Sequence, residues 1–475
     1  MRIVSHPILT FDRGKQITFK FDGKPIKAFE GETIAAALHA AGVKVLSHSL
    51  KRERPRGFFC AIGKCSSCMM EVDGVPNVKT CLVLADEGMD VRSQTGWGQL
   101  KDPDKKKSYP RKEIPVLETE VAIIGAGPAG LSAAIYASQF GAEVMVFEEN
   151  SLIGGQLIKQ THMFFGSKEH HAKVRGIDIG EKLVDSLNEN VTVLLETPVV
   201  GYYPPYQLAV IKEHRLHRVK AKKIIVATGA SENMLTFPNN DLPGVYGAGA
   251  VQTLMNVYGI LPGKRMLMVG AGNIGVIVAY QLLQAGVDVA AVVEALPTIG
   301  AYQVHASKLR RCGVPILTRH TVKRALGKDH VEGATLVQLD KNWEEVPGTE
   351  RDVEVDTICL SVGLKPTAEI FFQAGCRMAS ISELGGEVPV HNEYMETSVS
   401  GIYVAGDASS IEEASSAMLE GRLAGLDAVE KLRGSSAEIS KLKKHVLENL
   451  NELREGPFGE KIRQGEEKMK EAVQS

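Results

Sequence analysis

The chain has 475 residues, 44% of them hydrophobic, and a formal net charge of −2 at pH 7. This length predicts roughly two to four domains, and the near-neutral charge gives no drive toward nucleic acid or an acidic membrane. The amino-terminal residues lack the long apolar region of a signal peptide, and no run of about 18 apolar residues predicts a membrane span. We therefore expect a cytoplasmic protein.

The first 97 residues predict a small domain of strands around one helix. Residues 17–31 indicate a strand, an Asp-Gly turn and a second strand, and residues 32–43 indicate a helix with an apolar face. Residues 69–81 indicate a hairpin around a second Asp-Gly. This order, with a cysteine-rich loop, predicts a β-grasp ferredoxin-like domain over residues 1–97.

Four of the seven cysteines of the chain gather in this domain, with the spacing C-x4-C-x2-C-x12-C. A zinc ribbon usually pairs two C-x2-C units, whereas the x4-x2 triplet is the plant-type [2Fe–2S] spacing. Clustered cysteines in a reducing compartment are more often metal ligands or redox groups than disulfides. We therefore predict that Cys60, Cys65, Cys68 and Cys81 bind a [2Fe–2S] cluster; the alternatives are a zinc site or four ordinary buried thiols.

Four basic residues, Arg52, Arg54, Arg56 and Lys64, lie close to these cysteines in the sequence. They could offset the negative charge of the cluster and raise its reduction potential. A solvated basic loop and a docking patch for another subunit are the other two interpretations, and the sequence leaves all three open.

A lysine- and proline-rich stretch, residues 98–116, predicts a linker. The residues after it, 119–150, predict a strand, a Gly-x-Gly-x-x-Gly turn, a helix and a second strand that ends in an acid. The glycines let backbone amides approach a pyrophosphate at the start of the helix, and the acid can hold a ribose hydroxyl. The candidate residues of this first dinucleotide site are Gly125, Gly127, Pro128, Ala129, Gly130 and Glu148, with Gly155 and Gln156 from the following Gly-Gly pair.

A second copy of this pattern begins at Lys264, again with a strand, a glycine turn, a helix and a strand. An acid at the end of the second strand favours the free 2′-hydroxyl of NAD over the 2′-phosphate of NADP. We therefore predict an NAD(H) site here. Its candidate residues are Gly270, Gly272, Asn273, Ile274, Gly275 and Glu294.

Two apolar stretches, AKKIIVATGA with Gly229 and VDTICLSVGL, predict strands that return the chain to the two nucleotide sheets. Later, Asp407 follows a strand and Gly406, an arrangement that resembles the flavoprotein signature in which the Asp meets FAD. The predicted fold is therefore α/β, with two Rossmann-like dinucleotide-binding domains, one inserted in the other. The expected FAD domain covers residues 117–245 and 385–433, and the expected NAD domain covers residues 246–384.

The last segment, residues 434–475, predicts a helical tail. Ser435 and Glu438 have the spacing of a capping box. An apolar stripe follows at helical spacing, which could pack on the protein's own core, the slightly favoured interpretation, or on a partner subunit. The stripe consists of Ile439, Leu442, Val446, Leu450 and Leu453.

Residues 117 to about 433 resemble the flavoprotein family of thioredoxin reductases and NADH oxidases. Thioredoxin reductases carry a C-x2-C in the second nucleotide domain, whereas this chain has none and Cys312 stands alone in LRRCGVP, which argues against disulfide reduction. With residues 1–100 included, the chain resembles the α subunits of dye-linked amine dehydrogenases. That group includes L-proline dehydrogenase, heterotetrameric sarcosine oxidase, opine oxidase and hydrogen cyanide synthase, and the stretches that carry the resemblance are RPRGFFCAIGKCSSC, VDGVPNVKTC, GGQL, LPGVYGAGAVQTL and IEEASSAMLEGRLAG.

The resemblance implies an electron-transfer flavoprotein and iron–sulfur α subunit of a multi-subunit amine or imino-acid dehydrogenase. It implies FAD, a [2Fe–2S] cluster, NAD(H), and an FMN that can sit at a subunit interface. It also implies a catalytic β subunit with its own flavin and, in some complexes, further small iron–sulfur subunits. The alternatives are a self-sufficient NADH oxidase or NADH-dependent reductase, and a nucleotide-binding scaffold. The sequence identifies no catalytic residue and leaves the substrate open among proline, other amines, sarcosine and glycerol 3-phosphate.

Overall fold

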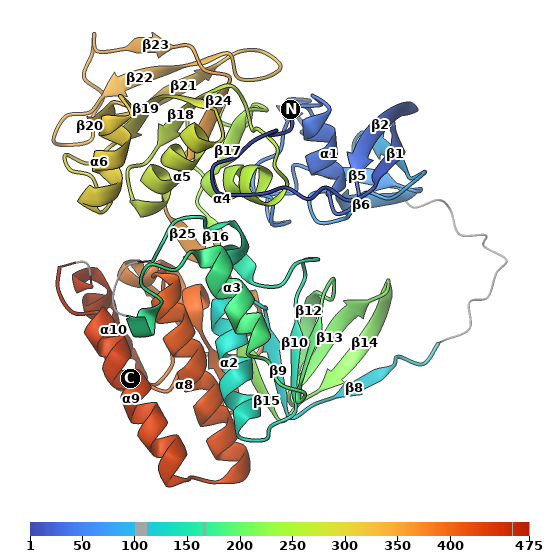
Figure 1. Cartoon of the computed structure of the whole chain (residues 1–475), viewed down its shortest axis with the longest axis vertical. Coiled ribbons are helices and arrows are strands. Elements are labelled where there is room, and N and C mark those ends of the chain that lie inside the picture. The colour runs from blue at the N-terminus through green and yellow to red at the C-terminus, as the bar shows by residue number, and fades with distance from the viewer. Residues whose placement is uncertain (100–111, 165–167, 458, 475) are drawn as a thin grey trace. The chain divides into compact units, whose positions relative to one another are not determined.

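The computed structural model of the chain describes residues 1–99, 112–164, 168–457 and 459–474 (Figure 1). Most of the predicted linker, residues 98–116, lies outside them. None of the helices among the described residues is long and apolar enough to cross a membrane.

The chain folds into two compact units, each made of two separate stretches. The first unit comprises Met1–Tyr109 and Glu232–Gly363, and the second comprises Pro110–Ser231 and Leu364–Ser475. The chain therefore changes unit after residues 231 and 363, whereas the sequence predicted domain ends after residues 245 and 384.

The amino-terminal part of the first unit is a mixed sheet with one helix. Its elements are β1 (Gln16–Phe21), β2 (Lys24–Phe29), α1 (Ile34–Ala40), β3 (Ser47–His48), β4 (Pro55–Arg56), β5 (Met69–Val72), β6 (Val75–Lys79) and β7 (Asp90–Ser93). The main sheet has the order β2-β1-β7-β5-β6. Both predicted hairpins and the predicted helix are present. The central strand β7 was not predicted, because four residues carry too little periodicity; it pairs parallel with the distant β1.

All seven residues of α1 are buried, although the helix carries a histidine. A helix buried on every side needs neighbours on every side, and here the other part of the same unit supplies some of them. His39 Nε2 lies 3.2 Å from the carbonyl oxygen of Leu261, and the N–H of Ile3 donates to the carbonyl of Gly259 at 2.7 Å. The ferredoxin-like domain therefore packs firmly on the second dinucleotide domain.

The rest of the first unit is that second dinucleotide domain. Its elements are β17 (Val245–Gly247), α4 (Ala248–Gln252), a π-helical turn (Thr253–Val257), β18 (Arg265–Val269), α5 (Asn273–Gln284), β19 (Asp288–Glu294), α6 (Gln303–Arg311), β20 (Ile316–Thr318), β21 (His320–Leu326), β22 (Gly333–Gln338), β23 (Arg351–Val353) and β24 (Thr357–Leu360). The main sheet is parallel, in the order β17-β24-β18-β19-β20. The predicted return strand VDTICLSVGL forms β24, beside β18.

The second unit repeats this plan. Its elements are β8 (Val116–Glu118), β9 (Val121–Ile124), α2 (Pro128–Gln139), β10 (Val144–Phe147), α3 (Gly176–Asp185), β11 (Val191–Leu194), β12 (Val199–Tyr203), β13 (Gln207–Lys212), β14 (Arg215–Lys220), β15 (Lys223–Val226), β16 (Ala230–Glu232, where the chain leaves the unit), β25 (Leu364–Pro366), α7 (Glu369–Gln373), β26 (Met378–Ile381), β27 (Gly386–Pro389), β28 (Ile402–Val404), α8 (Ala414–Arg433), α9 (Ala437–Leu453) and α10 (Glu460–Gln474). The main sheet is parallel, in the order β11-β10-β9-β15-β28, and a second sheet has the order β12-β13-β14-β8.

Helices α2 and α8 pack against each other at very short range (Figure 1). A Cβ on Gly421 would lie 2.1 Å from the carbonyl oxygen of Ala129, and one on Gly425 would lie 2.5 Å from that of Ala133. Only glycine fits at such a backbone approach. The sequence EGRLAG therefore sets how closely α8 covers the start of α2.

The carboxy-terminal tail packs on the rest of the second unit. Buried Ile439, Val446 and Leu450 of α9 belong to the same apolar core as α2 and α8, so the prediction that the stripe packs within the chain is confirmed. The predicted capping residue was wrong by one position. Ser436 caps the helix by accepting from the N–H of Ile439 at 3.1 Å, whereas the hydroxyl of Ser435 donates to Glu430.

Candidate functional site

The cysteine loop joins β4 to β5 in the first unit, and Cys81 follows β6. Cys60, Cys68 and Cys81 are buried, and Cys65 is half-buried. All four are free thiols. The structure therefore brings the four predicted ligands together, with the Cys65 edge closest to solvent.

The four thiols form a continuous chain of contacts, from Cys65 to Cys60 to Cys81 to Cys68. Hydrogen bonds from Cys65 and Cys81 lower the pKa of Cys60, and one from Cys81 lowers the pKa of Cys68. The donating role raises the pKa of Cys65 and of Cys81. Among the described residues, no group of three or more His, Cys, Asp or Glu side chains is arranged so that it could hold a metal ion as it stands. Four adjacent thiols are nevertheless the donor set that an iron–sulfur cluster requires.

The backbone of the loop is shaped to donate to these sulfurs. The N–H of Cys65 donates to Cys60 Sγ at 3.4 Å, and backbone N–H groups of Ile62 and Ser67 also donate to loop thiols. Ala61 and Ser66 have φ values of 55° and 58°, a left-handed conformation that costs energy in residues other than glycine. N–H···S bonds stabilise thiolate charge and raise the potential of a cluster, so the loop is suited to an iron–sulfur cluster.

The second dinucleotide domain closes one side of this loop. The N–H of Gly247 donates to the carbonyl of Phe59 at 3.0 Å, and a Cβ on Gly57 would lie 2.7 Å from Pro243 Cα. Cys60 belongs to an apolar cluster built mainly from strands of that domain. Cys60 is therefore buried between two domains of one unit, which the sequence did not predict.

Two of the four basic residues near the cysteines serve this domain contact. Arg54 pairs with Asp241 at 2.6 Å and Arg56 pairs with the same carboxylate at 3.6 Å. Arg52 and Lys64 are exposed. The sequence left open whether these four residues offset the cluster charge, form a solvated loop or form a docking patch. The last two interpretations apply only to Arg52 and Lys64, because Arg54 and Arg56 are paired with Asp241.

The first glycine fingerprint lies between β9 and α2. Gly125 has φ of 105°, and a Cβ on Gly130 would lie 1.9 Å from the carbonyl oxygen of Gly125. These two glycines are therefore required by the turn itself. A Cβ on Gly127 would meet only Gly155 Cα, at 3.8 Å. The space beside Gly127, where Pro128 and Ala129 begin α2, is open as a pyrophosphate site requires.

Glu148 at the end of β10 lies against this turn and is 5% exposed. One carboxylate oxygen accepts from the N–H of Ala126 at 2.9 Å, and the other accepts from the N–H and side-chain amide of Asn150 at 2.9 and 2.6 Å. The carboxylate is thereby fixed next to the fingerprint, as a ribose-binding acid needs to be.

The predicted Gly-Gly pair packs directly on the fingerprint. A Cβ on Gly155 would lie 2.6 Å from Gly127 Cα, so no other residue fits there without a shift. Gln156 is exposed, and Gly229 follows β15 with a φ of 67° and no described atom within 4 Å of a Cβ. The structure thus places Gly155 against the first glycine fingerprint and shows open space beside Gly229.

The turn after β28 also reaches the start of α2. A Cβ on Gly406, where φ is 70°, would lie 2.9 Å from Ala129 Cβ. Asp407 beside it is half-buried, and burial raises the pKa of its carboxyl to about 7, opposed by a hydrogen bond from the N–H of Glu412. A recessed carboxyl of this kind fits a hydroxyl-bearing ligand, so Asp407 and the fingerprint together are compatible with FAD.

Sequence reasoning missed the residue that holds this turn. Glu420 of α8 is 2% exposed. Its carboxylate accepts from the N–H of Gly406 and from the hydroxyl of Ser409, both at 2.8 Å. The sequence feature that could have indicated Glu420 is that it is the one acid among small and apolar residues in AMLEGRLAG, a stretch with helical spacing.

The second fingerprint, between β18 and α5, repeats the geometry of the first. Gly270 has φ of 103°, and a Cβ on Gly275 would lie 2.1 Å from the carbonyl oxygen of Gly270. No described atom lies within 4 Å of a Cβ on Gly272. Glu294 accepts from the N–H of Ala271 at 2.7 Å and of Leu296 at 2.9 Å. The second fingerprint therefore has the same glycine turn, the same open space beside its middle glycine and the same carboxylate next to the turn as the first.

Two further candidates complete this second site. The side-chain oxygen of Asn273 accepts from the N–H of Tyr302 at 2.9 Å, which ties the start of α5 to the following loop. Ile274 is 41% exposed. Asn273 therefore holds the turn in place through its hydrogen bond, and Ile274 presents an exposed apolar side chain beside the turn.

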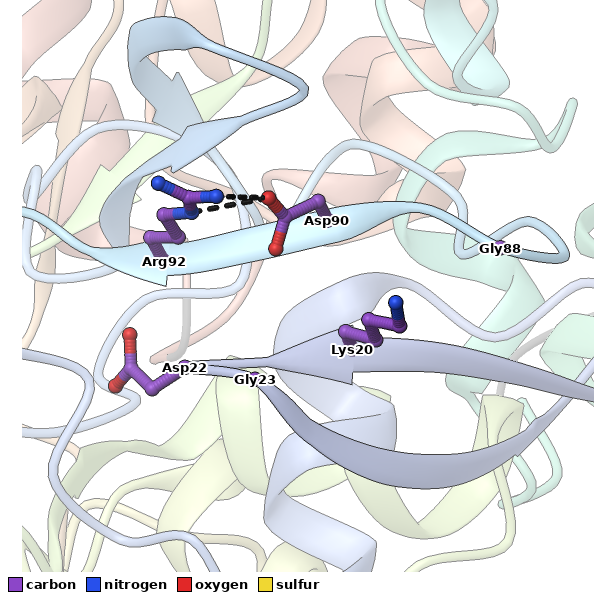
Figure 2. Close-up of a pocket in the computed structure, with 6 residues that line it drawn as sticks. All are labelled: Lys20, Asp22, Gly23, Gly88, Asp90 and Arg92. Atoms are coloured by element: carbon purple, nitrogen blue, oxygen red, sulfur yellow. Dashed lines mark hydrogen bonds and ion pairs between the residues drawn. The ribbon is translucent and has the colours of Figure 1, made fainter.

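A surface hollow lies elsewhere in the first unit, on β1, β7 and the turn that follows β1. Figure 2 shows its lining, with Asp90 and Arg92 joined by an ion pair at 2.6 Å. Asp22 accepts from the N–H and the hydroxyl of Ser93. These groups are already paired, and none of the predicted site residues lines the hollow. It consists of Lys20, Asp22, Gly23, Gly88, Asp90 and Arg92.

Comparison with known families agrees with this geometry. Residues 119–421 match the pyridine nucleotide-disulphide oxidoreductase family, across both fingerprints and Asp407. The chain belongs to the pyridine nucleotide-disulphide oxidoreductase family. Residues 14–96 match a 2Fe-2S iron-sulfur cluster binding domain, which includes all four clustered cysteines.

Within this family the chain is similar to subunits of multi-subunit amine-oxidising enzymes. It is 29% identical to the sarcosine oxidase α subunit of Rhizobium meliloti (strain 1021), over 61% of this chain and 35% of that one. It is 30% identical to one subunit of the opine oxidase of the same strain, over 65% of this chain and 70% of that one. The chain spans less than half the length of the sarcosine oxidase α subunits that it matches.

Solved structures extend the comparison to nearly the whole chain. The L-proline dehydrogenase of P. horikoshii superposes with a TM-score of 0.71 at 28% identity, over 94% of this chain and 79% of that one. The T. acidophilum thioredoxin reductase matches with a TM-score of 0.55 at 22% identity, over 66% of this chain and 99% of that one, and shares the fold.

These matches confirm the predicted fold, two Rossmann-like domains preceded by a ferredoxin-like domain, and the predicted resemblance. The chain combines a flavin oxidoreductase domain with a 2Fe-2S domain, which supports FAD and an iron–sulfur cluster as its cofactors.

Proposed function

We propose that this chain is the electron-transferring α subunit of a multi-subunit amine or imino-acid dehydrogenase. The single observation that carries the proposal is the similarity to L-proline dehydrogenase over 94% of the chain, in which the ferredoxin-like domain and both dinucleotide domains are included. Sarcosine oxidase, opine oxidase and hydrogen cyanide synthase subunits among the relatives support the same class of nitrogen-bearing substrate.

The proposed assignment of residues follows the three sites. The four clustered cysteines hold the [2Fe–2S] cluster, the first fingerprint with Glu148 and Asp407 holds FAD, and the second with Glu294 holds NAD(H). A flavin exchanges both hydride and single electrons, so it connects two-electron substrates to a one-electron cluster. The chain's own groups supply the backbone donors, the carboxylates and the buried thiol pocket for these cofactors.

The proposed partners are a catalytic β subunit with its own flavin, an FMN at the interface with it, and small iron–sulfur subunits. The relatives are named as subunits of larger enzymes, which supports a hetero-oligomer. Cytoplasmic localisation is part of the proposal, because free clustered thiols suit a reducing compartment.

Purification of the chain with and without its complex tests the proposal. Amine-dependent dye reduction should require a co-purified β subunit, and the isolated chain should carry flavin and iron but oxidise no amine. Full amine dehydrogenase activity in the isolated chain would refute the proposal that it works as part of a complex.

A second candidate function, a self-sufficient NADH oxidase or NADH-dependent reductase, is favoured by the complete second fingerprint with Glu294. In that case, NADH should bleach the flavin of the isolated chain rapidly and without a partner. Bound nucleotide without any redox response would instead support a scaffold role.

FAD affinity should rise with pH if Asp407 contacts the flavin. The pKa of its carboxyl is raised to about 7 by burial, and a ligand hydroxyl donates more strongly to the ionised form. Binding then favours deprotonation, so affinity should increase by about tenfold from roughly pH 6 to roughly pH 8. Fluorescence titration of the flavin-free chain across this range measures it. Asp407→Asn should remove the slope, and an unchanged slope in that variant would contradict the contact.

Glu294→Ala should weaken NADH binding and narrow its margin over NADPH. The carboxylate that accepts from ribose hydroxyls also repels a 2′-phosphate, and its loss should cost on the order of 1–3 kcal/mol, or about ten- to a hundredfold in affinity. Calorimetric titration with both nucleotides measures the effect. Wild-type protein that binds neither nucleotide below millimolar concentration would show that this site has lost its ligand.

A further inference from the structure

Arg454 directly follows α9, at the carboxy-terminal cap of that helix, and is 9% exposed. Its guanidinium lies 2.5 Å from Glu412, 2.6 Å from Glu420 and 3.3 Å from Glu466. Glu412 belongs to the loop before α8, Glu420 to α8 itself and Glu466 to α10. One cation thus joins three carboxylates from three segments of the second unit.

Two of these carboxylates hold the turn that carries Asp407. Glu420 accepts from the N–H of Gly406 and from the hydroxyl of Ser409. Glu412 accepts from the hydroxyl of Ser410 at 2.7 Å, and its own N–H donates to the carboxylate of Asp407. Each of these hydrogen bonds lies within a few residues of the proposed flavin contact.

These carboxylates need a cation because they are removed from water. Burial raises the pKa of Glu420, and the charge of Arg454 opposes that shift. Three hydrogen-bond donors, from Gly406, Ser409 and Arg454, favour the ionised form of Glu420. Without the guanidinium, acids from three segments would face one another with little solvent, which is strongly unfavourable, and the turn would lose its support.

We propose that Arg454, from the carboxy-terminal tail, is a positioning residue for the FAD site of this chain. It neutralises Glu412 and Glu420 so that they hold residues 406–410 in the geometry that presents Asp407 to the flavin. This inference rests on the proposed assignment of FAD to the first fingerprint. It gives the tail a role in the redox site in addition to its packing on the core.

A second buried cation of α9 provides a matched control. Lys443 is 7% exposed and pairs with Asp427 and Glu430 of α8 at 2.6 and 2.7 Å. It joins the same two helices, and its ion-pair partners lie outside the turn formed by residues 406–410. Lys443→Met therefore removes a comparable ion pair without touching the proposed positioning network.

The experiment compares Arg454→Met, Arg454→Lys and Lys443→Met in the full-length chain freed of flavin. FAD dissociation constants come from flavin fluorescence, and the melting temperature of the flavin-free protein reports folding. We expect Arg454→Met to weaken FAD binding about 10- to 100-fold, the size of loss that removal of an outer-shell partner causes at metal sites. Arg454→Lys should restore part of the affinity, and Lys443→Met should lower the melting temperature while FAD affinity stays at the wild-type value.

Wild-type FAD affinity in folded Arg454→Met protein would overturn the inference, and so would an equal loss in Lys443→Met. If Arg454→Met does not fold, Glu420→Gln keeps the size of the side chain but removes its charge. Weakened FAD binding in that variant supports the inference, and unchanged binding overturns it. A wild-type chain that binds no FAD would instead refute the proposed function on which the inference rests.

Discussion

Cys68→Ser should leave the protein without its iron–sulfur cluster. Cys68 is 4% exposed and in hydrogen-bond contact with Cys81, so its sulfur is one of the four donors in the pocket. Iron and sulfide should fall from roughly two each per chain in wild-type protein to near zero. Metal and sulfide analysis after anaerobic purification, with the visible absorbance of the cluster, measures the result.

Cys312→Ser is the matched control, because this thiol is exposed and far along the sequence at the end of α6. It should retain full iron content. A wild-type protein with stoichiometric zinc and no iron would contradict the cluster assignment. Full iron content in Cys68→Ser would show that the cluster has other ligands.

Gly127→Val should abolish FAD binding while the protein stays folded. The backbone at Gly127 is extended, with φ of −80°, which valine adopts without strain. A Cβ there meets no described atom closer than 3.8 Å, so the new side chain would occupy the space that we propose for the pyrophosphate. We expect at least about a hundredfold loss of affinity, or roughly 2.7 kcal/mol, with little change in the melting temperature of the flavin-free chain.

Gly272→Val makes the same change in the second fingerprint, where the backbone φ is −74° and a Cβ has no described neighbour within 4 Å. It should leave FAD binding intact and remove NADH binding, the reverse of Gly127→Val. Flavin-to-protein ratios and nucleotide titrations of both variants give a reciprocal test. Undiminished flavin in folded Gly127→Val protein would place FAD elsewhere in the chain.

The parts of this protein that the sequence predicted well depend on neighbours close along the chain. Gly125 and Gly130 form a turn whose geometry is settled within six residues, and strand β9 and helix α2 on either side of it are strongly patterned. The cysteine cluster was predictable for the same reason, since three of its four thiols lie in one loop and are therefore close along the chain.

The errors and omissions all involve partners distant in sequence or a choice between adjacent residues. Strand β7 has four residues and is defined by pairing with β1, about 70 residues earlier. Arg54 and Arg56 lie beside the cysteines but pair with Asp241. The helix cap moved from Ser435 to Ser436, because the Ser436 hydroxyl accepts from the N–H of Ile439 whereas the Ser435 hydroxyl donates to Glu430.

The sequence by itself determined the fold class, the two dinucleotide fingerprints and the cysteine cluster, because turns, periodicity and ligand spacing are local properties of the chain. Only the tertiary structure decided that the ferredoxin-like domain packs on the second dinucleotide domain, with Cys60 buried in their shared apolar cluster. It alone also brought Arg454 to Glu420, 34 residues away, and so to the Gly406 turn. Side chains this far apart meet through the packing of α8 and α9, for which no short pattern codes.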